Sequence, residues 1–287
     1  MKSILLATDI APETDRALER AINLATTLSA KLYIVHVSPE KSFSSEKKTA
    51  DTLRLGAEDA LREYLQEYGE LQNLKPTVKV IEGREVYLEI IQYAEKVRAG
   101  LIVMGMHGKA SLLDMFVGTT IERVIRKGIK PVLMVKNKPQ GDYSNTLVGT
   151  DFSAGSKQAF HVALEVAQKG SFHLVHSFDI PDTNIGAKIE QFAGDVIEQC
   201  EKNELAKFVR ENVRILKKFG IDPRRFHYQV VRGAAFYCLM HEAKNIKADL
   251  IAIGTHSRTT LLPYKLGGTA HDILSNPPCD VLVAKGI

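Results

Sequence analysis

The chain repeats itself, because short segments of its first half return in the same order in its second half. Leu6-Ala7-Thr8-Asp9 returns as Val148-Gly149-Thr150-Asp151, and Leu101-Ile102-Val103-Met104-Gly105 returns as Leu250-Ile251-Ala252-Ile253-Gly254. The copies stay about 140 to 150 residues apart, so they differ only by short loop changes. The repeat predicts two domains of ordinary size, residues 1–138 and 144–287, joined by a short polar stretch with Pro139 and Gly141.

Within each copy, short apolar segments alternate with longer amphipathic ones. In the first copy we expect strands at residues 3–8, 31–37, 77–82, 100–104 and 131–136. One helix face between them is marked by Ala17, Leu18, Ala21, Ile22, Leu24 and Ala25. A second, less regular face is marked by Leu53, Leu55, Ala60, Leu61 and Leu65. This alternation predicts an α/β fold, with parallel strands, right-handed crossovers and helices on both faces of each sheet.

One loop of the first copy is rich in glycine. It runs Gly105-Met106-His107-Gly108, then nine residues, then Gly118-Thr119, and a helical pattern begins at Thr120. A strand, a glycine loop and a helix start form an arrangement in which backbone N–H groups hold phosphate. Glycine suits it because an anion can approach the backbone without meeting a Cβ. The loop is not a Walker A motif, since no G-x-x-x-x-G-K-[ST] occurs in the chain.

This loop resembles the nucleotide-binding motif of universal stress proteins. The resemblance extends to Ile4–Asp9, to Val35-His36-Val37 and to Lys130–Val135, and through the repeat it covers nearly the whole chain. It implies two tandem copies of a five-stranded parallel sheet in the order 3-2-1-4-5. In that order the switch point lies between strands 1 and 4, where ligands bind outside the carboxyl ends of the strands.

The resemblance also implies a set of ATP-binding residues in the first copy. Ala7, Thr8 and Val37 would surround the base, Met104 would lie beside the nucleotide, and Asp9 would accept a hydrogen bond from a ribose hydroxyl or the adenine amine. Gly105, Gly108 and Gly118 would offer main-chain donors to the phosphates, with or without Mg²⁺. Thr119 and Thr120 would add donors at the helix start. The alternative is that Asp9 and Thr119 only cap helices and the glycines only turn the chain.

The second copy departs from this motif. It reads Gly254-Thr255-His256-Ser257, then nine residues, then Gly267-Gly268-Thr269. Ser257 replaces the second glycine, Gly268 stands where the first copy has Thr119, and Ser177 matches Val37. Asp151 and Gly267 remain. We therefore expect a degenerate pocket that is empty or holds something other than ATP.

Histidine and cysteine gather in the second half, which holds seven of the nine histidines and all three cysteines. Cys238 and His241 share a helix face, but no tight Cys/His pairing motif is present. We therefore favour histidines that are scattered through the fold and do not bind a metal. A zinc site is kept as the alternative. His36 and His176 occupy equivalent strand ends, which suggests a shared structural role.

Composition limits the classes of partner and the cellular compartment that we expect. A net charge of +4 on 287 residues is too mild to indicate nucleic acid as a partner, and no apolar run is long enough to span a membrane. An odd, sparse set of three cysteines is typical of a reducing compartment. We expect a cytoplasmic protein.

Three functions are compatible with these patterns. The favoured one is an ATP-binding regulatory protein of the stress response, with nucleotide in the first domain. A slow ATPase or phosphotransferase would use the same pocket, but neither a base nor an acidic metal pair is recognisable, and we assign no catalytic or metal residues. The third is an interaction scaffold whose second domain binds a non-nucleotide ligand or a metal.

The final strands of the two copies predict how the two halves of the chain assemble. Residues 131–136 and 280–285 are apolar and lie at the sheet edge in the implied order, and such an edge needs a cover or a partner. By resemblance to single-copy relatives that dimerise through this strand, the two halves would pack as an intramolecular pseudo-dimer. A further homodimer stays open.

Overall fold

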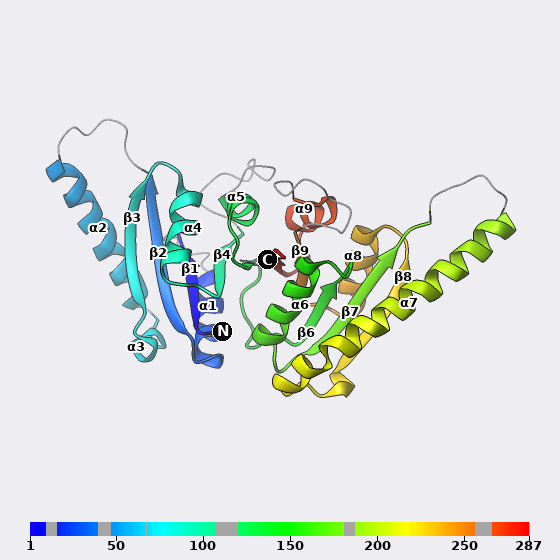
Figure 1. Cartoon of the computed structure of the whole chain (residues 1–287). Coiled ribbons are helices and arrows are strands. Elements are labelled where there is room, and N and C mark those ends of the chain that lie inside the picture. Colours follow the sequence, from blue (N-terminus) through cyan, green and yellow to red (C-terminus); the bar gives the residue numbers. More distant parts are fainter. Residues whose placement is uncertain are drawn as a thin grey trace. The chain divides into compact units, whose positions relative to one another are not determined.

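Two compact units make up the chain, residues 1–141 and 142–287. The computed structural model describes residues 1–9, 16–39, 47–66, 68–106, 120–180, 187–255 and 266–286. Each unit has its own sheet and its own covering helices (Figure 1).

The first unit is built on a parallel sheet with the strand order β3-β2-β1-β4-β5. Its strands are β1 (Ser3–Ala7), β2 (Lys31–Pro39), β3 (Thr77–Gly83), β4 (Leu101–Gly105) and β5 (Val132–Val135). β1 pairs with β2 from Ser3 opposite Lys31, and with β4 up to Ala7 opposite Met104. Since β1 lies between β2 and β4, the strand order reverses there, as the resemblance implied.

Helices cover both faces of this sheet. They are α1 (Arg16–Thr27), α2 (Lys47–Gln66), α3 (Leu71–Leu74), α4 (Val86–Lys96) and α5 (Thr120–Lys127). Right-handed crossovers place α1 to α3 on one face and α4 and α5 on the other. In agreement with this, α1 contacts α3, and α4 contacts α5.

The buried helix faces match the sequence pattern in one helix and only in part in another. α1 buries the predicted set, Ala17, Leu18, Ala21, Ile22, Leu24 and Ala25. In α2, Leu61 and Leu65 are buried, but the prediction for Ala60 is wrong because its side chain is exposed. One residue is about 100° of helical rotation, which turns Ala60 away from the face of Leu61. The side chains of Leu53 and Leu55 lie outside the described part.

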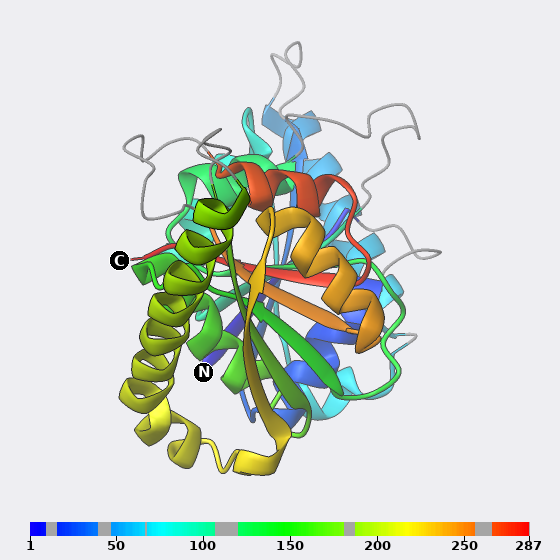
Figure 2. The same ribbon diagram turned by 90° about the vertical axis from the view of Figure 1, so that its right-hand side faces the viewer.

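The second unit repeats this topology with the strand order β8-β7-β6-β9-β10. Its strands are β6 (Asn145–Gly149), β7 (Ser171–Phe178), β8 (Phe226–Arg232), β9 (Leu250–Gly254) and β10 (Asp280–Ala284). Its helices are α6 (Ala154–Val166), α7 (Ala187–Lys218), α8 (Ala235–Asn245) and α9 (Gly268–Ser275), with a short 3₁₀ turn at Pro223–Arg225. α7 lies on one side of the strands, and α8 with α9 on the other (Figure 2).

Both cores explain why the inner strands β1, β4 and β9 are apolar, whereas the outer strands β3 and β8 are largely half-buried or exposed. Ile4, Leu5, Leu101 and Val103 are buried in the first unit, as are Leu147, Leu250 and Ile251 in the second. A strand covered by helices on both faces has no side chain left for solvent, so it carries no polar alternation. The predicted fold, two tandem five-stranded parallel sheets covered on both faces, is confirmed.

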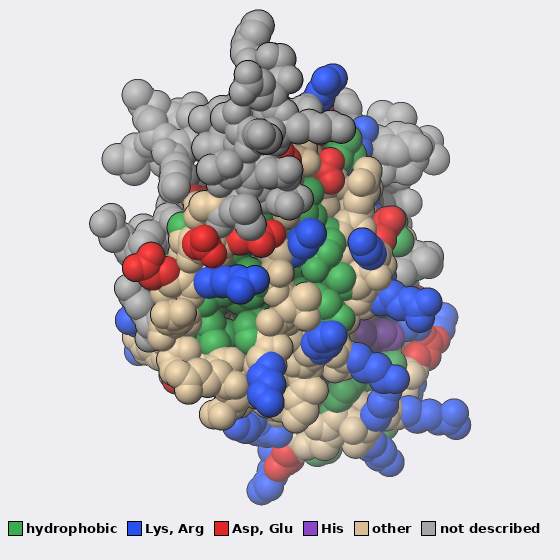
Figure 3. Space-filling view, turned by 90° about the vertical axis from the view of Figure 1, so that its left-hand side faces the viewer, with side chains coloured by type: hydrophobic (Ala, Val, Ile, Leu, Met, Phe, Trp, Pro, Cys, Tyr) green, Lys and Arg blue, Asp and Glu red, His purple; other side chains and the backbone are tan. Residues whose placement is uncertain are grey.

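The surface of the first unit is mixed in character. On the face shown in Figure 3, Lys and Arg side chains are dispersed, with Asp, Glu and hydrophobic side chains among them. Among the helices of the described segments, none is both long enough and apolar enough to cross a bilayer.

Candidate ligand sites at the carboxyl ends of the strands

The structure brings most of the expected ligand residues of the first unit to one end of its sheet. Ala7 ends β1 and lies opposite Met104, the next-to-last residue of β4, which ends at Gly105. Val37 follows two residues after Val35, the β2 partner of Ala7. Thr120 is the first residue of α5. Three expected phosphate contacts, Gly108, Gly118 and Thr119, lie outside the described residues.

Hydrogen bonds of the backbone and of one side chain hold this end of the first sheet. The Thr8 N–H donates to Val35 O at 3.0 Å, and His36 Nδ1 donates to Thr8 O at 2.9 Å. Just beyond β4, the Met106 N–H donates to Val135 O at 3.0 Å. These bonds fix Thr8, His36 and Met106 at the carboxyl end of the sheet.

Asp9 stands out among these residues. Its Oδ2 atom is buried and has no hydrogen-bond partner within the described segments. A buried carboxylate oxygen without a donor is costly, on the order of 1–3 kcal/mol or more for a charged group. A ligand hydroxyl or amine would supply the missing donor, so Asp9 fits the role expected of it.

The second unit has a pocket at the corresponding place. Its volume is about 300 Å³, near the lower end of the usual range for small-molecule sites. It lies between the ends of β6, β7 and β9 and the start of α9. It is lined by Gly149, Thr150, Asp151, Ser156, Val175, Ser177, Ala235, Leu239, Ile253, Gly254, Thr255, Gly267, Gly268, Thr269 and Ala270. Ser257 of the degenerate motif lies outside the described residues.

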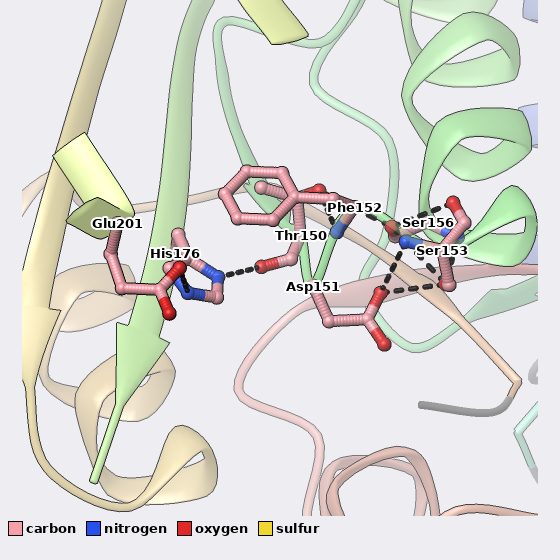
Figure 4. A network of polar contacts seen from close by, with 7 residues as sticks. All are labelled: Thr150, Asp151, Phe152, Ser153, Ser156, His176 and Glu201. Atoms are coloured by element: carbon pink, nitrogen blue, oxygen red, sulfur yellow. Dashed lines mark hydrogen bonds and ion pairs between the residues drawn. The ribbon is translucent and has the colours of Figure 1, made fainter. Parts of the chain in front are cut away.

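The polar groups on one wall of this pocket bind one another (Figure 4). Asp151 Oδ1 accepts hydrogen bonds from the Ser153 N–H at 3.1 Å and from Ser153 Oγ at 2.6 Å. Ser153 is also the N-cap of α6 and accepts from the Ser156 N–H at 3.2 Å. Thr150 Oγ1 accepts from the Phe152 N–H at 3.1 Å. Asp151 is thus engaged within the protein, unlike Asp9 Oδ2.

A histidine supports the same wall. His176 Nδ1 donates to Thr150 O at 2.7 Å, just as His36 does to Thr8 O, so the predicted shared structural role is confirmed. In the second unit, Phe152, in the left-handed region at φ 64°, stacks on the ring at 4.4 Å between centroids. Glu201 Oε2 of α7 lies 3.0 Å from His176 Nε2, an ion-pair distance whose angle falls short of a hydrogen bond. Sequence reasoning missed Phe152 and Glu201, because no local pattern brings α7 to this strand.

The first glycine of the second motif has a packing role. A Cβ on Gly254 would lie 2.7 Å from Ser156 N and 2.9 Å from Gly155 C, so β9 can pass the start of α6 only without a side chain. A Cβ on Gly268 would meet nothing within 4 Å. The two glycines of the degenerate motif are therefore under different constraints.

The histidines do not form a metal centre in the described part of the chain, where no group of three potential ligands is found. His173 and His227 lie side by side on β7 and β8, with ring centroids 4.9 Å apart, and Glu242 Oε1 is 4.0 Å from His173 Nδ1. Burial, reinforced by the neighbouring His227, lowers the pKa of His173, and Glu242 opposes this shift. His256 lies outside the described residues.

Comparison with known proteins agrees with this architecture. A model of the universal stress protein family matches residues 1–136 and, a second time, residues 142–285. The chain belongs to the universal stress protein family. Both of its units are therefore universal stress protein domains, in tandem.

Individual relatives cover either one domain or the whole chain. Universal stress protein MJ0531 of Methanocaldococcus jannaschii is 34% identical over 145 residues, which are 48% of this chain and 84% of that protein. Universal stress protein E of Salmonella typhi is 24% identical over 305 residues, covering 99% of this chain and 94% of its own. A crystal structure of a universal stress protein from Archaeoglobus fulgidus has a TM-score of 0.68 at 20% identity, covering 99% and 98% of the two chains. At that identity the likeness shows the fold alone.

Proposed function

We propose that this universal stress protein is a cytoplasmic regulatory protein that binds one ATP in its first domain. The single observation that carries the proposal is Asp9 Oδ2, a buried acceptor at the switch point with no partner among the described residues. The nucleotide would bind between the ends of β1, β2 and β4, with its phosphates on the glycine loop. Asp9 would accept from the ribose or the adenine amine.

Each of these residues would contribute binding rather than bond cleavage. Ala7, Thr8 and Val37 would surround the base, Met104 would contact the nucleotide, and Gly105, Gly108, Gly118, Thr119 and Thr120 would hold the phosphates. Phosphoryl transfer would further need a positioned nucleophile and ligands for Mg²⁺. The spacer between Gly108 and Gly118 offers Asp114 as its only carboxylate. We therefore favour a binding protein over a slow ATPase or phosphotransferase.

Isothermal titration of the whole protein with ATP tests the proposal. We expect one site per chain, abolished by Gly118→Val and hardly altered by the matched variant Gly267→Val. Two equal sites, or loss of binding in Gly267→Val alone, would contradict it. Phosphate release faster than about one per second with Mg²⁺, lost in Asp9→Ala, would favour the enzyme instead.

The pocket of the second domain supports a second proposal, a site for a ligand other than ATP. Its volume of about 300 Å³ is small, and Asp151 already accepts two hydrogen bonds from Ser153. Native mass spectrometry of the purified protein tests this. A bound small molecule that ATP does not displace supports it, whereas ATP bound at both sites contradicts it.

We also retain the proposal that the two domains pair through residues 131–136 and 280–285 as a pseudo-dimer. NMR relaxation of the full chain tests it, since paired domains would tumble together with one correlation time. Two independent correlation times would show that it is wrong.

A further inference from the structure

The segment that follows β5 is attached to helix α1, and both ends of this segment are held there. Lys136 O accepts a hydrogen bond from Arg16 Nη1 at 2.6 Å, and Gly141 O accepts one from Arg20 Nη1 at 2.8 Å. Between these bonds, Lys138 Nζ lies 3.3 Å from Glu19 Oε1. Residues 136–141, the start of the connection to the second domain, are therefore held along the first domain; we refer to them as the strap.

Arg20 is the most buried of these attachments. It is only 5% exposed, and a buried guanidinium is tolerated only where acceptors surround it. A carbonyl of the strap is one of those acceptors. Arg16 and Lys138 are more exposed, so their contacts contribute less.

The second domain shows that the fold itself does not require these residues. Ala17 and Ala21 of α1 correspond to Ala159 and Ala163 of α6, which are likewise buried. In the same alignment Arg16, Glu19 and Arg20 correspond to Gln158, His161 and Val162. At these positions the first domain has two guanidinium groups and the second domain has none.

The first residue of the strap and the residue before it bind the two chain segments that flank the candidate ATP site. Val135 O accepts from the N–H of Met106, the residue directly after Gly105, at 3.0 Å. The next carbonyl, Lys136 O, is held by Arg16, the first residue of the helix that follows Asp9. In the second domain, the Thr255 N–H donates to Ala284 O at 3.0 Å, which is the counterpart of the bond between Met106 and Val135.

We propose that ligand binding in the first domain tightens the strap, so that occupancy of the site controls the freedom of the connection between the domains. A ligand bound to the backbone of Gly105 would hold the adjacent Met106 N–H against Val135 O. The strap, which begins at the next residue, would then lose less entropy on binding Arg16. The ligand part of this inference rests on the proposed function, whereas the strap itself does not. Coupling of this kind is reciprocal, so a loosened strap weakens ligand binding by the same factor.

Limited trypsin digestion of the full-length protein measures the strap directly. Trypsin can cut after Lys136 but not after Lys138, which precedes Pro139. The rate is followed by mass spectrometry as the appearance of the fragment that begins at Asn137. Without ligand, we expect Arg16→Gln, which installs the residue found at 158, to speed this cut about fivefold, as loss of one net hydrogen bond would. Arg20→Met should speed it about tenfold or more.

Glu19→Gln is the matched control, because it leaves the strap sequence intact and removes only an exposed ion pair. Its cleavage rate should stay within about twofold of the wild-type rate. Melting curves of each variant verify folding, and Arg16→Gln keeps the test valid if Arg20→Met does not fold. If both Arg variants fold and their cleavage rates equal the wild-type rate, the strap is wrong. If Arg20→Met does not fold, an unchanged rate in a folded Arg16→Gln is enough to show this.

Saturating ATP tests the coupling. We expect it to slow cleavage after Lys136 about fivefold in the wild-type protein, at the low end of typical coupling. Arg16→Gln should lose this effect and bind ATP about fivefold more weakly by titration calorimetry. ATP that binds without slowing cleavage overturns the coupling but leaves the proposed function standing. If the protein does not bind ATP, both the proposed function and the coupling are wrong. The cleavage rates of the Arg variants without ATP still test the strap.

Discussion

Asp9 and Asp151 occupy the same place in the two domains, yet the protein uses them differently. Asp151 Oδ1 is bound by the N–H and the hydroxyl of Ser153, two residues further on. The residue two positions after Asp9 is Ala11, which has no side-chain donor, and Asp9 Oδ2 has no partner among the described residues. In the described residues, the carboxylate of Asp151 is therefore bound by a nearby serine, whereas one oxygen of Asp9 is buried without a donor.

The largest effect is expected from Gly254→Ala, which tests whether the second motif is kept for packing. The added Cβ would lie 2.7 Å from the backbone N of Ser156. We expect the free energy of unfolding of the second domain to fall by about 1–3 kcal/mol, measured by urea denaturation. The control Gly268→Ala, with open space around its Cβ, should change stability by less than about 1 kcal/mol. Equal effects in the two variants would show that Gly254 is not a packing glycine.

Alanine at the two aspartates should separate binding from stability. Asp151→Ala removes an acceptor with two hydrogen bonds, and we expect it to lower the free energy of unfolding by about 1–2 kcal/mol while leaving ATP affinity unchanged. Asp9→Ala should leave the stability of the ligand-free protein unchanged or raise it, and should weaken ATP binding at least about tenfold. Denaturation and titration calorimetry on both variants check this. The comparison breaks if Asp9→Ala destabilises the protein as much as Asp151→Ala does.

Ala11→Ser would place a serine two residues after Asp9, as Ser153 stands two residues after Asp151. If a serine two residues after the aspartate satisfies the carboxylate, Asp9 should become less available and ATP affinity should fall about threefold, the equivalent of a partial hydrogen bond. Titration calorimetry measures the change, and Ala11→Gly controls for loss of the methyl group. Tighter binding in Ala11→Ser would mean that the hydroxyl contacts the ligand instead.

The smallest expected difference is a pH dependence confined to the second domain. Burial and the neighbouring His227 lower the pKa of His173 from 6.5, so the unfolded chain binds this proton more tightly than the folded chain. This contribution to the free energy of unfolding is fully present above pH 6.5. It is lost as the pH falls from 6.5 through the folded-state pKa of His173. His173→Gln should reduce the drop in melting temperature between about pH 7.5 and 5.5. The equivalent pair in the first domain, Tyr33 opposite Thr77, contains no histidine. Tyr33→Phe should leave the drop unchanged.

The sequence alone determined the architecture of each domain. Apolar strands and the helix face of α1 repeat with periods that local chemistry imposes, so the alternation of strands and helices and the position of Asp9 after β1 could be predicted. The strand order and the switch point followed from the resemblance to universal stress proteins. The repeat itself predicted the second domain, and the altered residues at 257 and 268 predicted that its motif is degenerate. The exposed Ala60 shows the limit of this reasoning, because an irregular pattern does not define a helix face to one residue.

Only the tertiary structure decided how the polar groups at each site are paired. The contact of Glu201 with His176 and the hold of Arg16 and Arg20 on residues 136–141 join segments far apart in the chain. Hydrogen bonds of this kind depend on distances of about 3 Å between atoms that no periodicity relates. The same holds for Gly254, whose need for an absent Cβ comes from the backbone of α6 rather than from a ligand. Local pattern predicts which residues reach the carboxyl ends of the strands, and packing decides which of their polar atoms remain for a ligand.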